Sequence, residues 1–102
     1  MTRKSALRSL IVRPEAEADI DDAAAYYAER EVSLALRFVD EVDRVMSVIR
    51  AHPRQFPLFD EPARRALLHR FPFGVYFEAF DDRVVVLAVL HLRRHPEEWK
   101  DR

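Results

Sequence analysis

Apolar and polar residues alternate at helical spacing through the first half of the chain. After Pro14, which suits the first turn of a helix, apolar residues recur every three or four positions. A second stripe with the same period runs to Arg50, and Ser33 stands where the N-cap of that helix is expected. Because residues 31–33 leave room only for a turn, the pattern predicts two antiparallel helices.

Strand patterns flank the two helices. Residues 7–13 are rich in apolar residues and run into Pro14, which disfavours a helix before it. In the last third, runs of strand length are rich in aromatic or β-branched residues, at positions 65–70, 73–80 and 83–91. Asp81 and Asp82 suit a tight hairpin turn between the last two runs. Residues 84–90 are apolar on both alternating faces, which predicts a central strand covered on both sides.

Together these elements predict an α+β fold in a single domain spanning residues 1–102. The chain is expected to form an N-terminal strand, an antiparallel helical hairpin, a proline-containing loop to about Pro62 and a three-stranded antiparallel meander. We expect a small curved sheet with the helices on one face. The opposite face then needs loops, strong curvature or a partner chain to cover it.

Composition narrows the classes of function. The chain has one Gly and no Cys, which excludes Gly-rich phosphate loops, disulfides, thiolate metal sites and cysteine nucleophiles. His52, His69 and His95 lack the spacing of a metal site, and we expect neither a metal nor a cofactor. A formal net charge of -1 argues against binding nucleic acid through bulk charge. No apolar run approaches the roughly 18 residues of a membrane helix, so we expect a cytoplasmic protein without a membrane partner.

Basic residues near the predicted strand ends are candidate catalytic residues. Metal-free RNA cleavage needs a base, a cation and an acid that converge on one concave surface. The residues that would supply these groups, if the strand ends meet at one edge of the sheet, are Arg65, Arg70, His91 and Arg93. In the alternative interpretation, Arg65 and Arg70 pair with acids such as Glu78 or Asp60, and His91 is a packed residue at a strand end.

Other residues are candidates for binding. Arg and Trp are common at binding hot spots, so we expect a target-binding set of Arg65, Arg70, Arg93, Arg94 and Trp99. An alternative role for Trp99 is to cap the open end of the core. If the second sheet face or the groove beside the hairpin is uncovered, exposed apolar side chains mark an interface there, namely Leu34, Phe38, Phe56 and Phe59.

Several short sequence motifs occur together in this chain, and the combination is specific although no single motif is. They are residues 18–20 and 24–27, His52-Pro53, the run Arg70-Phe71-Pro72-Phe73-Gly74-Val75-Tyr76-Phe77, residues 86–91 and residues 94–99. With the predicted order of elements, the chain resembles the RelE/ParE family of bacterial type II toxins over nearly all of its length. The resemblance implies a growth-arresting toxin that a small antitoxin encoded beside it holds inactive. It also implies that the antitoxin's C-terminal segment covers the apolar residues named above and screens the arginines.

The resemblance leaves the target open between two branches. Members similar to RelE cleave messenger RNA in the ribosomal A site, whereas members similar to ParE block DNA gyrase without chemistry of their own. The chain has no catalytic-looking Lys, and Trp99 stands where cleavage would need a hydroxyl or an imidazole. We therefore expect a ParE-like gyrase inhibitor, with a ribosome-dependent endoribonuclease as the alternative and a non-toxic interaction or autoregulatory member as a further one.

Overall fold

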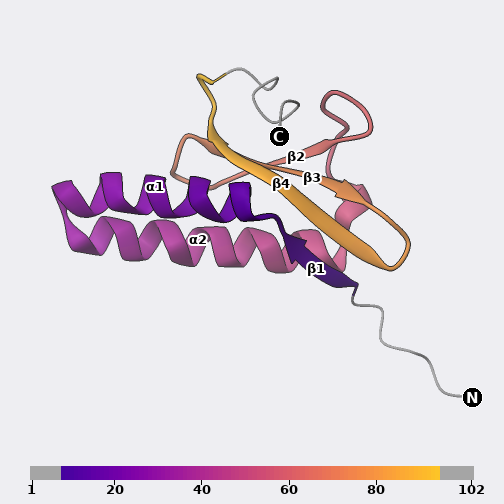
Figure 1. Cartoon of the computed structure of the whole chain (residues 1–102), viewed down its shortest axis with the longest axis horizontal. Coiled ribbons are helices and arrows are strands. Elements are labelled where there is room, and N and C mark those ends of the chain that lie inside the picture. Colours follow the sequence, from indigo (N-terminus) through magenta and orange to yellow (C-terminus); the bar gives the residue numbers. More distant parts are fainter. Residues whose placement is uncertain (1–7, 95–102) are drawn as a thin grey trace, which may run out of the picture.

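The computed structural model describes residues 8–94. The elements in chain order are β1 (Ser9–Val12), α1 (Pro14–Arg30), α2 (Val32–Ala51), the short 3-10 helix η1 (Pro53–Gln55), β2 (Arg64–Leu67), β3 (Phe73–Ala79) and β4 (Arg83–His91). The two helices lie side by side beneath one face of the sheet (Figure 1). This arrangement confirms the α+β fold that the hydrophobic pattern predicts.

The four strands form one mixed sheet in the order β1-β4-β3-β2. β1 is parallel to β4, whereas β4, β3 and β2 form the expected antiparallel meander. β4 therefore has a strand on each side. Its residues are apolar on both faces because the helices cover one face and the loop before β2 covers part of the other. The ladder between β3 and β4 shifts register between Tyr76 and Phe77, where a bulge changes the partner of each following residue.

The sheet separates two apolar clusters, because successive side chains of a strand point to opposite faces. On the helix side, Phe38 and Ile49 of α2 pack against a cluster that contains Val75 and Phe77 of β3. On the other side, Tyr76 of β3 packs with Leu87, Ala88 and Leu90 of β4 and with Ala63 and Phe59 of the preceding loop. The second face is thus covered in part by the chain's own loop, one of the three expected solutions.

Three sequence predictions are corrected by the structure. Ser33 does not cap α2: the helix already begins at Val32, because Glu31 alone makes the turn in an extended conformation and its carbonyl accepts the N–H of Leu34. β2 ends at Leu67, three residues before the predicted end, because the chain turns back toward β3 from residue 68. Phe38 is fully buried in the core and offers no surface to a partner. Within residues 8–94, no helix is long and apolar enough to cross a membrane.

Candidate functional site

Arg65 lies on the sheet face away from the helices. It pairs with Tyr76 across the β2–β3 ladder, and directly opposed residues of two strands share a face. Its guanidinium carbon sits 4.2 Å from the centroid of the Phe59 ring, an arrangement that favours a cation–π contact. A Cβ on Gly74 would lie 3.1 Å from Arg65 Cδ, so the glycine leaves room for the arginine stem to cross the strand.

His91 lies on the helix face at the end of β4. It pairs with Phe73, the two ring centroids are 5.3 Å apart, and Phe73 belongs to the helix-side cluster. His91 Nδ1 accepts a hydrogen bond of 3.1 Å from the backbone N–H of Arg93. The histidine lines a cavity of about 480 Å³ with Tyr26 and Tyr27 of α1, among other residues. Burial raises the pKa of the Tyr27 hydroxyl, which stays protonated at neutral pH.

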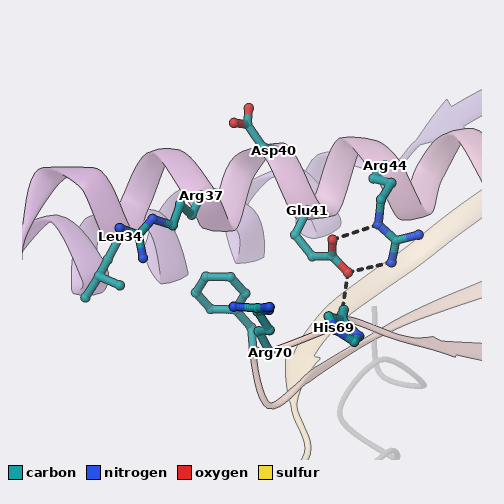
Figure 2. Close-up of a pocket in the computed structure, with 8 residues that line it drawn as sticks. Leu34, Arg37, Asp40, Glu41, Arg44, His69 and Arg70 are labelled. Carbon is teal, nitrogen blue, oxygen red and sulfur yellow. Dashed lines mark hydrogen bonds and ion pairs between the residues drawn. The ribbon is translucent and has the colours of Figure 1, made fainter.

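Arg70 occupies a third position, in the turn between β2 and β3. Its backbone has φ of 74°, in the left-handed region that residues other than Gly or Asn rarely adopt. Its side chain lines a cavity of about 420 Å³ between α2 and this turn (Figure 2). The other residues of the cavity are Leu34, Arg37, Asp40, Glu41, Arg44, His69 and Phe71.

The predicted convergence of the basic residues does not occur. Arg65 and His91 lie on opposite faces of the sheet, because β-strand side chains alternate and the two residues have opposite parity along the shared ladder. Arg70 faces α2. Arg93 and Arg94 are exposed in the turn after β4. Trp99 lies outside the described residues.

The alternative pairing with local acids is also absent from the part of the chain that the structure describes. Arg65 contacts the Phe59 ring, and neither Arg65 nor Arg70 forms an ion pair within residues 8–94. The same interpretation also predicts that His91 is a packed residue at a strand end, and this agrees with its contact to Phe73. In the same range, no three His, Cys, Asp or Glu side chains are grouped so as to hold a metal ion.

Glu41 connects α2 to the β2–β3 turn at one end of the Arg70 cavity. Its carboxylate accepts two hydrogen bonds of 2.7 and 2.8 Å from Arg44 and one of 2.6 Å from the backbone N–H of His69 (Figure 2). The bonds from Arg44, reinforced by the His69 N–H, lower the pKa of Glu41 to about 2. Sequence reasoning missed this connection, although the spacing of Glu41 and Arg44 is typical of a helical ion pair.

The predicted apolar interface is only partly exposed. Besides the buried Phe38, Leu34 lines the Arg70 cavity and is half-buried. The Phe56 ring packs on Phe77 at 5.9 Å, and the Phe59 ring packs on Tyr76 at 5.6 Å. Within residues 8–94, the large apolar side chains with the greatest exposure are others: Ile11, Tyr26, Val32, Leu36, Leu58, Leu67 and Leu92. Of these, Leu36 belongs to the apolar stripe of the second predicted helix, but the structure leaves it exposed.

Comparisons with known proteins agree on one family. The family model described as "ParE toxin of type II toxin-antitoxin system, parDE" matches residues 10–96. A solved structure described as "Chromosomal ParDE TA system from P. aeruginosa" has the same fold, with a TM-score of 0.75 and 22% sequence identity, over 85% of this chain and 98% of that one. Among curated proteins, no match was found. Since the family match covers most of the sequence, this chain belongs to the ParE toxin family of type II toxin-antitoxin systems.

Proposed function

We propose that this protein is a toxin that inhibits DNA gyrase by binding, without chemistry of its own, and that a cognate antitoxin neutralises it. The observation that carries the choice of target is the separation of Arg65 and His91 on opposite sheet faces. Cleavage of RNA requires a base, a cation and an acid around one phosphate. A cation on one face and an imidazole on the other do not meet that requirement, whereas a large protein target can contact both.

The state of the basic side chains supports a binding role. The Arg65 guanidinium lies over the Phe59 ring, and His91 is packed against Phe73 while its Nδ1 accepts a hydrogen bond from the main chain. Groups held in this way suit a preorganised interface, because their side chains lose little conformational freedom on binding. Arg93 and Arg94 add exposed guanidinium groups beside His91.

Neutralisation by an antitoxin has separate support. The solved relative is described as a ParDE toxin-antitoxin system. In this chain, Tyr26, Val32 and Leu36 expose more than half of their surface at the end of the helical hairpin. Exposed apolar groups of this kind mark protein interfaces. The antitoxin, encoded beside the toxin, would act in the cytoplasm by covering surface rather than by changing it chemically.

A supercoiling assay tests the target. Purified protein is added at micromolar concentration to gyrase, relaxed plasmid and ATP, and the DNA is examined before and after detergent and protease treatment. We expect less supercoiling and the appearance of linear plasmid, because the toxin would hold gyrase on cleaved DNA. Premixing with the antitoxin should restore supercoiling.

Two results would contradict the proposal. Unaffected gyrase together with messenger RNA cleavage on ribosomes would favour the endoribonuclease, provided that substitution of Arg65 and His91 by Ala abolishes that cleavage. Normal growth after induced expression of folded protein, without any antitoxin present, would instead favour a non-toxic member of the family.

A further inference from the structure

The cavity between α2 and the β2–β3 turn carries a specific binding chemistry. We propose that it holds an acidic side chain of the antitoxin next to an apolar one, with Arg37 and Arg70 as the two cations that grip the carboxylate. This inference rests on the proposed neutralisation by an antitoxin, and it names the chemistry of one contact. The cavity measures about 420 Å³, enough for one or two side chains.

The charges in the cavity do not cancel. Arg44 is already bound by Glu41, so this pair adds little net charge. The side chains of Arg37 on α2 and Arg70 in the turn form no hydrogen bond or ion pair with any residue in the described range 8–94. Figure 2 shows the Asp40 carboxylate directed away from the cavity. Two guanidinium groups are therefore free to bind an anion, and their planar donor forks match a carboxylate.

The apolar part of the cavity is rigid. Phe71 lines it, and its ring packs edge-on against Tyr27 at 5.2 Å and against Phe38 at 5.4 Å. Leu34 lines the cavity from α2. Arg37 and Leu34 lie together on α2, and Arg70 faces them from the turn (Figure 2). An apolar side chain can pack on Phe71 and Leu34 while its acidic neighbour reaches the arginines.

An acidic protein segment suits the cavity better than nucleic acid does. Two guanidinium groups at one side of the cavity match a single carboxylate. A nucleic acid instead presents a row of phosphates, which needs a longer basic surface. The floor formed by Leu34 and Phe71 also offers an apolar contact that a phosphate backbone cannot use.

The backbone conformation at Arg70 allows one substitution to distinguish a binding role of this residue from a structural one. At φ of 74°, an arginine is strained by about 1–2 kcal/mol relative to a glycine. Replacing it with Gly removes the guanidinium and relaxes the turn at the same time. If Arg70 served only the stability of the fold, the variant would be destabilised; if it serves binding, the variant loses affinity while its thermal stability is kept or raised.

The experiment measures the affinity of the full-length protein for the purified antitoxin, the product of the adjoining reading frame, by calorimetry. We expect Arg70→Gly and Arg37→Gln each to weaken binding by roughly tenfold or more, as loss of a charged interface partner does. The melting temperature of Arg70→Gly should not fall. The wild-type affinity should also decrease as salt rises, and this dependence should be smaller in both variants.

Arg54→Gln is the matched control. Arg54 lies on η1, and within residues 8–94 its side chain forms only a long, exposed ion pair of 3.4 Å with Asp81. The substitution removes the same charge away from the cavity and should change the affinity by less than about twofold. Wild-type affinity in Arg37→Gln and Arg70→Gly would overturn the inference while leaving the proposed neutralisation intact. An antitoxin that does not bind the wild-type protein would overturn both.

A DNA probe tests the alternative that the cavity binds nucleic acid. A labelled duplex of about 20 base pairs is titrated with the wild-type protein and the same variants at low and physiological salt. We expect weak binding that does not depend on Arg37 or Arg70. Tight binding that both substitutions abolish would assign the cavity to phosphate and contradict the acidic protein segment.

Discussion

At the scale of single residues, a glycine determines how Arg65 lies. Gly74 is the only glycine of the chain and sits inside β3, where glycine is usually unfavourable. A Cβ there would approach Arg65 Cδ to 3.1 Å and Cγ to 3.2 Å. The glycine therefore allows the arginine stem to cross the strand and its guanidinium to stack on Phe59.

Gly74→Ala should move Arg65 off the Phe59 ring without unfolding the protein. We expect the Arg65 Nε–Hε resonance to lose the shift that the ring current causes, measured by NMR, and gyrase inhibition to weaken several-fold. In an Arg65→Ala background, the added Gly74→Ala change should have little effect on inhibition, because the side chain it displaces is gone. An unchanged Arg65 resonance would contradict this positioning role.

Glu41 makes part of the stability depend on pH. Its pKa is lowered from 4.5 to about 2 in the folded chain, so the folded state favours the carboxylate. This contribution is complete above the unfolded pKa and disappears as the pH falls through the folded one. Because Arg44 remains largely exposed, with 58% of its side chain accessible, water screens the pair and the contribution is modest.

Glu41→Gln should lower the free energy of unfolding by about 1–2 kcal/mol at neutral pH. The difference in unfolding free energy between the variant and the wild type should shrink between about pH 5 and pH 2, because the wild-type carboxylate becomes protonated and loses its charge there. Urea unfolding followed by circular dichroism over this range measures it. A difference that stays constant down to the lowest pH would show that the charge of Glu41 contributes nothing.

At the scale of elements, a partly buried hydrogen bond connects α1 to β4. Asp19 Oδ2 accepts the backbone N–H of Val89 at 2.9 Å, across 70 positions of sequence. Val89 follows the bulge that shifts the β3–β4 ladder, and its side chain belongs to the helix-side cluster. The apolar stripe of α1 gives no sign of this bond, because Asp19 lies outside the stripe and the hydrophobic pattern alone predicts that it faces solvent. The structure corrects this prediction, since Asp19 is half-buried against β4.

Asp19→Ala should destabilise the fold by about 1–3 kcal/mol, because it leaves the partly buried Val89 N–H without its carboxylate acceptor. Asp19→Asn is the control, since the amide oxygen can still accept the bond, and it should have a smaller effect. Equilibrium unfolding gives the energies, and hydrogen exchange of the Val89 amide reports the local opening. Equal stability of the two variants would show that the hydrogen bond is unimportant.

The element boundaries show where local patterns are too weak. The start of α2 and the end of β2 differ from the pattern, whereas the existence and order of the elements agree with it. Periodicity extends over many residues and is therefore robust, but a boundary depends on one or two. Glu31 makes the helix turn alone and occupies the N-cap position, so Ser33 lies inside the first turn of α2 despite its preference for a cap.

At the scale of the whole molecule, the sheet divides the basic residues between two surfaces. Arg65 faces the side covered by the loop before β2, while His91 and Arg70 face the side of the helices. A small ligand cannot contact both surfaces at once. A macromolecule that wraps the sheet edge can do so, which is why the arrangement supports a large target.

Arg65→Ala and His91→Ala should therefore act independently. We expect the two losses of gyrase inhibition, expressed as free energies, to add within about 0.5 kcal/mol in the double variant. Residues that share one catalytic step behave differently, since the second substitution then costs little. Inhibition curves for the wild type and the three variants measure this, and strong non-additivity would place both residues in one site.

The sequence alone determined the classes of element, their order and the identity of the central strand. These properties follow from the periods of apolar residues, which depend only on whether a side chain is to be buried in a helix or a strand. The motif around Arg70 and the one that begins at Arg94 also indicated the family that the comparison confirms.

Only the tertiary structure decided which side chains share a surface. A shift of one residue moves a strand side chain to the opposite face, and the bulge between β3 and β4 makes such a shift part of the fold. Their positions at strand ends suggested that Arg65 and His91 could share one site. Their partners on β3, Tyr76 and Phe73, point to opposite faces of the sheet and separate them. The same long-range packing buried Phe38 and brought Arg37 of one helix opposite Arg70 of a distant turn.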